Sequence, residues 1–71
     1  MELSARNQIT GTITAIELGA VMADVTVAIG SSQSLAAAIT RSSVERLGLK
    51  VGDTVVLIIK ATDVMLGKPT Q

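Results

Sequence analysis

The chain lacks three residue types that small proteins commonly use to build stability or function. Its 71 residues contain no cysteine, no histidine and no aromatic residue. Without cysteine there is no disulfide framework, and without cysteine and histidine there is no thiolate or imidazole metal site. A chain this short buries only about 60% of the surface that its unfolded form exposes, so an isolated monomer is marginally stable. Oligomerisation is the remaining way to supplement the core.

Aromatic side chains and net charge are also missing, and this argues against two classes of partner. Proteins that bind single-stranded nucleic acid stack the bases on Phe, Tyr or Trp. The formal net charge of zero removes the basic footprint expected for nucleic acid or an anionic membrane. The first 20 residues are interrupted by polar side chains (Glu2, Arg6, Asn7 and Glu17), and no apolar run is long enough to span a bilayer. We therefore expect a cytoplasmic protein with no nucleic-acid or membrane partner.

The groups needed for catalysis are sparse. Six carboxylates are scattered along the chain, with no His, Cys or Tyr to form a nucleophile and base with them. We expect no enzymatic activity and no cofactor.

The apolar pattern predicts an all-β fold. Residues 7–18 and 21–29 alternate as strands, and the first changes phase near Ala15, which indicates a β-bulge. Further strands are predicted over 34–40, 54–59 and 61–66. Thr40 or Ser42 is expected to cap a short helix ending at Leu47, with Glu45 completing a capping box from Ser42 and Gly48 as the stop. This order is typical of a small five-stranded OB-like Greek-key barrel with one short helix between strands 3 and 4. We expect one domain over residues 1–67 and a frayed tail over 68–71.

Two of the predicted strands are apolar on both faces. Residues 35–39 read Leu-Ala-Ala-Ala-Ile and residues 55–59 read Val-Val-Leu-Ile-Ile. A barrel of this size has one interior, so the outward-facing apolar side chains need partner subunits. The sequence predicts an obligate homo-oligomer.

Three clusters combine hydroxyls, cations and small residues, as anion sites do. The first is Ser4-Ala5-Arg6, followed by Asn7 and Gln8; the second is Lys60-Ala61-Thr62; the third is the hydroxyl pair Thr40 and Ser43 at the expected helix start. Arg offers a planar fork of donors, and a helix start offers free N–H groups. Each cluster also has a plain structural interpretation: a solvated arm, a strand that ends in a solvated lysine, and an N-cap.

Together these pieces resemble the molbindin (Mop) family of molybdate-binding modules. The match runs through Ser4-Ala5-Arg6-Asn7-Gln8, Gly11-Thr12, Ile16, Gly19-Ala20-Val21-Met22-Ala23, Ala38-Ile39-Thr40, Ser43-Val44, Leu47-Gly48-Leu49, Gly52-Asp53 and Ile59-Lys60-Ala61-Thr62. The resemblance implies an OB-like barrel, a hexamer built as a trimer of dimers, and oxyanion sites at subunit interfaces.

Carried over by position, the resemblance implies a principal oxyanion site. Its residues would be Ser4, Ala5, Arg6, Thr40, Ser43, Lys60, Ala61 and Thr62, contributed in part by a neighbouring subunit. A second oxyanion position, near a threefold axis, is assigned to the turn Gly19-Ala20-Val21. Met22 stands where many relatives have Asn, and Thr62 where many have Ser, so a side-chain contact is in doubt only at Met22.

The expected function is binding of molybdate or tungstate, to store or buffer the anion in the cytoplasm. The alternative is an interaction module whose oxyanion sites control assembly with a transporter or regulator.

Overall fold

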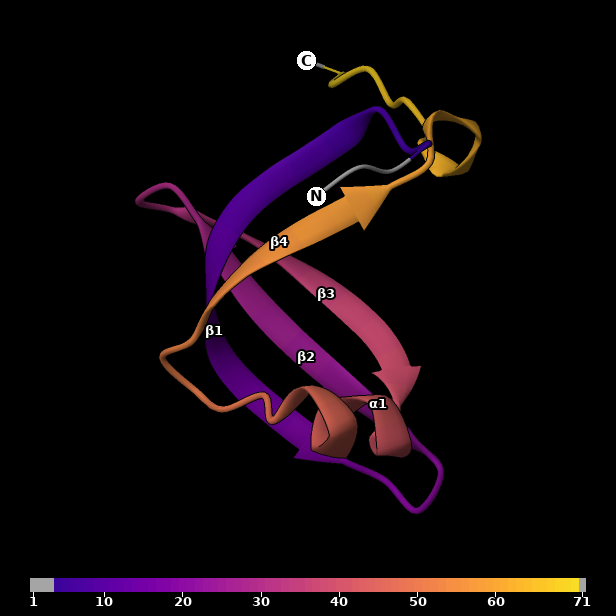
Figure 1. Ribbon diagram of the computed structural model, residues 1–71. Helices are drawn as coiled ribbons and strands as arrows, with labels where there is room; N and C mark the ends of the chain where they lie inside the picture. Colours follow the sequence, from indigo (N-terminus) through magenta and orange to yellow (C-terminus); the bar gives the residue numbers. More distant parts are fainter. Residues whose placement is uncertain (1–3, 71) are drawn as a thin grey trace.

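The computed structural model describes residues 4–70 and shows one antiparallel sheet with a short helix (Figure 1). Its elements are β1 (Asn7–Leu18), β2 (Met22–Ile29), β3 (Gln33–Thr40), α1 (Arg41–Leu47), β4 (Thr54–Ile59) and a 3-10 turn, η1 (Ala61–Asp63). The strand order is β3-β2-β1-β4, so β1 and β2 are central. Residues 1–3 of the expected domain and Gln71 of the expected tail lie outside the described residues. Within residues 4–70, no helix has the length and hydropathy needed to cross a bilayer.

The long strand β1 bends and pairs with two neighbouring strands. Its first half, Asn7 to Thr12, pairs with β4, and its second half, Thr12 to Leu18, pairs with β2. The register with β2 shifts between Ile13 and Ala15, which confirms the predicted bulge. Figure 1 shows the resulting curve of β1 through the molecule.

The core lies between the two central strands of the sheet and α1. Ile13, Ala23, Val25 and Val27 are buried from the two central strands, and Val44 is buried from the helix. The partly buried residues packed around them are Ile16, Ile39, Leu49, Val55 and Leu57. The predicted alternation in β2 is confirmed because Ala23, Val25 and Val27 face inward.

The helix α1 begins and ends on specific caps. The Thr40 hydroxyl accepts a hydrogen bond from the Ser43 backbone N–H at 3.1 Å, and Gly48 terminates the helix in the left-handed conformation at φ 63°. Of the two predicted caps, Thr40 is therefore the one used. The predicted capping box between Ser42 and Glu45 is wrong. The helix begins at Arg41 with Thr40 as its N-cap, so Ser42 lies inside the helix and is not the capping residue. Glu45 lies instead 3.7 Å from the Nε of Arg41.

The predicted fifth strand is not formed. Residues 61–63 make the turn η1, and residues 64–70 have no regular structure. A strand needs a hydrogen-bonded neighbour, and beyond η1 the chain leaves the sheet. Val64, Met65 and Leu66 are consequently 48%, 92% and 96% exposed. With β3 and β4 as the two edges, the four strands of residues 4–70 form an open sheet rather than the predicted closed five-stranded barrel.

Candidate functional site: an anion hollow at the start of β1

Antiparallel pairing of β1 with β4 joins the first two predicted clusters. Asn7 pairs with Ile59, so the residues before β1 lie beside the residues after β4. An open hollow of about 250 Å³ forms there, lined by Ser4, Ala5, Arg6, Lys60, Ala61 and Thr62. We call it the Arg6–Lys60 hollow. The sequence-based prediction named these same six residues for the principal oxyanion site.

The Arg6–Lys60 hollow presents donors and positive charge. Arg6 and Lys60 supply the two cations, and Ser4 and Thr62 supply hydroxyls. Among residues 4–70, no Asp or Glu belongs to its lining. The remaining lining residues, Ala5 and Ala61, have small uncharged side chains. Such a set is suited to an anion with several oxygens, since charge-assisted hydrogen bonds are the strong ones.

Local hydrogen bonds to backbone carbonyls hold both segments of the hollow. The Gln8 side-chain amide donates to the Ala5 carbonyl at 3.4 Å, which ties the first segment to β1. The Asp63 backbone N–H donates to the Lys60 carbonyl at 2.9 Å and closes η1 directly after β4. The turn that replaces the predicted fifth strand therefore orients Lys60, Ala61 and Thr62 toward the hollow.

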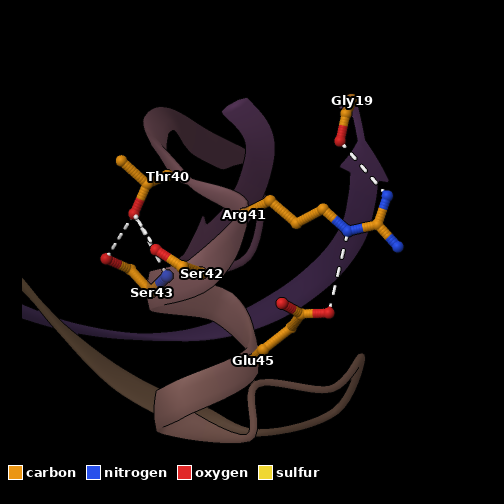
Figure 2. Close-up of polar contacts among 6 residues, drawn as sticks. All are labelled: Gly19, Thr40, Arg41, Ser42, Ser43 and Glu45. Atoms are coloured by element: carbon orange, nitrogen blue, oxygen red, sulfur yellow. Dashed lines mark hydrogen bonds and ion pairs between the residues drawn. The ribbon is translucent and has the colours of Figure 1, made fainter. Parts of the chain in front are cut away.

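The other two predicted site residues, Thr40 and Ser43, lie at the opposite end of the sheet. Thr40 pairs with Met22 where β3 meets α1, near the end of β1 rather than its start (Figure 1). Each strand residue adds about 3.3 Å, so the length of β1 separates the two groups. The Thr40 and Ser43 hydroxyls are 2.7 Å apart, and the Ser42 hydroxyl is 3.2 Å from that of Thr40 (Figure 2). The single chain therefore does not bring Thr40 and Ser43 to the Arg6–Lys60 hollow.

A second hollow lies at the turn between β1 and β2. It measures about 270 Å³ and is lined by Glu17, Leu18, Gly19, Met22, Ala23 and Asp24. We call it the β1–β2 turn hollow. Gly19 of the predicted second oxyanion position belongs to it, but two carboxylates do as well. Sequence reasoning missed this pair. A two-residue turn at Gly19-Ala20 would place Glu17 opposite Met22, whereas the observed turn residues are Ala20 and Val21, which places Glu17 opposite Asp24.

A third hollow adjoins the first and shares Arg6 with it. It measures about 380 Å³ and is lined by Arg6, Asn7, Gln8, Ile9, Ile59 and Val64. Arg6 thus stands between an anion-suited hollow and a more apolar one that ends at the exposed segment beginning with Val64.

Sequence and structure comparisons define the class of protein. The chain matches the TOBE domain family over residues 3–66, and it belongs to this family. It is 43% identical over 67 residues to the "Probable molybdenum-pterin-binding protein" of Haemophilus influenzae, covering 94% of this chain and 97% of that protein. The resemblance to the molbindin (Mop) family is thereby confirmed.

Two solved structures agree with the observed fold. The molybdate-binding protein of Sporomusa ovata is 38% identical with a TM-score of 0.91, over 96% of this chain and all of that one (100%). The cytoplasmic molybdate-binding protein ModG, crystallised with molybdate bound, is 45% identical with a TM-score of 0.91 over 97% of this chain. This chain spans 49% of the ModG chain.

Proposed function

We propose that this protein binds molybdate or tungstate in the Arg6–Lys60 hollow and stores or buffers the anion in the cytoplasm. The observation that carries the proposal is the meeting of two cations and two hydroxyls in one hollow, with no carboxylate from the described residues 4–70 in its lining. The H. influenzae relative is a molybdenum-pterin-binding protein by name, and the S. ovata and ModG structures are of molybdate-binding proteins. Binding rather than catalysis is the proposed role.

Thr40 and Ser43 complete the site in this proposal from a neighbouring subunit. They lie at the far end of their own sheet, so their hydroxyls reach an Arg6–Lys60 hollow only when a second copy is present. The proposed assembly is a homohexamer arranged as a trimer of dimers. Its support on this chain is the exposed apolar surface of β4, where Val56 and Ile58 are 40% and 46% exposed.

Selectivity follows from the predominance of hydrogen-bond donors and positive charge in the hollow. Molybdate and tungstate are dianions that accept hydrogen bonds and have none to donate. Phosphate at neutral pH carries O–H groups, which need acceptors that a lining without carboxylates supplies poorly. Sulfate offers no O–H group but is smaller, so fixed donors spaced for molybdate do not all reach it.

A calorimetric titration with molybdate, tungstate, sulfate and phosphate tests the proposal. We expect the first two to bind far more tightly than the others. Arg6→Ala removes a charge-assisted bond, commonly worth about 1.5 to 3 kcal/mol, and so weakens molybdate binding by about 10-fold to more than 100-fold. Arg46→Ala is the matched control, because Arg46 is an exposed cation of α1 outside the hollow. Equal affinity for sulfate, or equal loss in both variants, would contradict the proposal.

The alternative proposal is a ligand-sensitive interaction module that controls assembly with a transporter or regulator. The observation that favours it is the position of Arg6, shared between the anion hollow and the adjoining one that ends at Val64. Light scattering with and without molybdate separates the two functions. A storage protein keeps one oligomeric state in both conditions, whereas a switch changes it.

A further inference from the structure

The two ends of β1 carry hollows of similar size and opposite character. The Arg6–Lys60 hollow and the β1–β2 turn hollow measure about 250 and 270 Å³. Of the residues that the structure describes, two cations and no carboxylate line the first, and two carboxylates and no cation line the second. The lining of the β1–β2 turn hollow also has no hydroxyl side chain.

The two carboxylates lie directly opposite each other. Glu17 of β1 pairs with Asp24 of β2, and both residues are exposed. Like charges at directly opposed positions of an antiparallel pair repel. Within residues 4–70, neither carboxylate takes part in an ion pair or side-chain hydrogen bond, so this negative charge is not offset by a contact.

The nearby cation Arg41 does not reverse the charge of the β1–β2 turn hollow. Its Nη1 donates to the Gly19 carbonyl oxygen at 3.4 Å, and its Nε lies 3.7 Å from a carboxylate oxygen of Glu45 (Figure 2). Glu45 therefore offsets the guanidinium charge. The Gly19 backbone N–H is also occupied, since it donates to the Met22 carbonyl at 2.7 Å.

We propose that Glu17 and Asp24 are specificity-determining residues that exclude oxyanions from the β1–β2 turn hollow. Each chain then has one oxyanion site, the Arg6–Lys60 hollow. This inference rests on the proposed function for the identity of the anion, and it replaces the expectation of a second site at Gly19-Ala20-Val21. The physical cause is repulsion between a dianion and two carboxylates that have no partner cation among residues 4–70, in a hollow whose described lining offers no cation in return.

Equilibrium dialysis with molybdate at neutral pH, followed by molybdenum analysis, measures the number of sites. We expect wild type to saturate at one molybdate per chain. Amide NMR spectra recorded during the same titration locate weak binding. In wild type the signals of the Arg6–Lys60 hollow should shift, and the Gly19 and Asp24 signals should not.

The variant Glu17→Gln with Asp24→Asn removes both charges with little change of shape. We expect its Gly19 signal, and that of the amide at position 24, to shift as molybdate reaches millimolar concentration. Asp24→Asn alone should show a smaller effect. Asp53→Asn is its matched control: it makes the same charge change in the turn before β4, and its remaining side-chain oxygen still accepts from the Lys50 N–H, a bond of 2.9 Å in wild type.

More than one molybdate per wild-type chain, or turn signals that respond equally in wild type and the double variant, would overturn the inference. So would a double variant whose turn signals stay unmoved. Failure of the proposed function looks different: wild type and Arg6→Ala would show no binding at the Arg6–Lys60 hollow. A gain at the turn in the double variant would still support exclusion by Glu17 and Asp24.

Discussion

Arg6 and Lys60 come from opposite ends of the sequence and line one hollow. Two like charges in one place repel when the hollow is empty, and a bound dianion turns that repulsion into attraction. The two positive charges therefore raise the affinity for the anion but lower the stability of the protein without ligand. Removing Arg6 should weaken anion binding while leaving the empty protein as stable as wild type or slightly more stable.

Gly11 is required by a close approach inside the sheet. A Cβ atom added there would lie 2.6 Å from the Ala28 carbonyl oxygen and 2.6 Å from a methyl carbon of Val27. We expect Gly11→Ala to destabilise the protein by about 1 to 3 kcal/mol, the usual effect of overpacking. Thermal unfolding monitored by circular dichroism measures the change.

Gly67→Ala is the control for Gly11→Ala, because an added Cβ at Gly67 meets no atom within 4 Å. Its effect should stay within about 0.5 kcal/mol. Equal melting temperatures for the two variants would show that the strand pairing around Gly11 is looser than described.

The residues that line the Arg6–Lys60 hollow were named through the resemblance to the molbindin family, because each cluster taken alone also has a plain structural interpretation. That the two clusters share one hollow follows from the pairing of β1 with β4, which composition alone does not give. The distance of Thr40 and Ser43 from the hollow was also beyond sequence reasoning. Their spacing indicates a helix cap equally well, and the structure shows that cap.

Strands and helix were predictable where side-chain periodicity is strong. The alternation over β2 and the phase change in β1 correspond to the observed inward face and bulge. The prediction of a fifth strand over Ala61 to Leu66 was wrong. Apolar and polar residues are mixed there without clear alternation, and a strand forms only where a neighbouring strand is available to pair with it. The two candidate caps, Thr40 and Ser42, lie two residues apart, and side-chain periodicity does not locate a helix start to within two residues.

Thr40 joins β3 to α1 and gives the helix its start. Thr40→Ala removes the acceptor of the Ser43 N–H, and we expect a loss of about 0.5 to 2 kcal/mol. Thr40→Ser should retain most of the stability because it keeps the hydroxyl. Urea unfolding of both variants is the measurement.

Ser42→Ala serves as the control for the cap. The Ser42 hydroxyl contacts the Thr40 hydroxyl at 3.2 Å but accepts no hydrogen bond from the backbone of α1, so the change should cost little. A loss as large as that of Thr40→Ala would mean that Ser42 contributes to the cap.

The molecule as a whole exposes apolar surface that a single chain cannot cover. Val56 and Ile58 project from β4, and Val64, Met65 and Leu66 extend beyond the sheet. Within the described part of the chain, the edge strands β3 and β4 also have no second strand neighbour. Open edges and apolar faces favour association, and partner copies that cover both would add to the small core of so short a chain.

Polar substitutions on β4 test this account of assembly. Val56→Thr combined with Ile58→Thr keeps β-branched residues but removes the apolar outer face, so we expect the proposed hexamer to dissociate into smaller species at micromolar concentration. Native mass spectrometry gives the distribution. Val51→Thr is the control, since Val51 is 63% exposed in the turn before β4 and outside that face. A wild type that is already a stable monomer would contradict the account.

The most direct test of the central claim, that the Arg6–Lys60 hollow binds the oxyanion, is the melting temperature of wild type and Arg6→Ala with and without molybdate. Free molybdate at 100 times its dissociation constant should stabilise wild type by about 2.7 kcal/mol. For a chain of this size that corresponds to an increase of roughly 10 °C or more. We predict that Arg6→Ala loses most of this increase while its ligand-free melting temperature equals or slightly exceeds that of wild type. A molybdate-induced increase that persists in full in Arg6→Ala would contradict the claim.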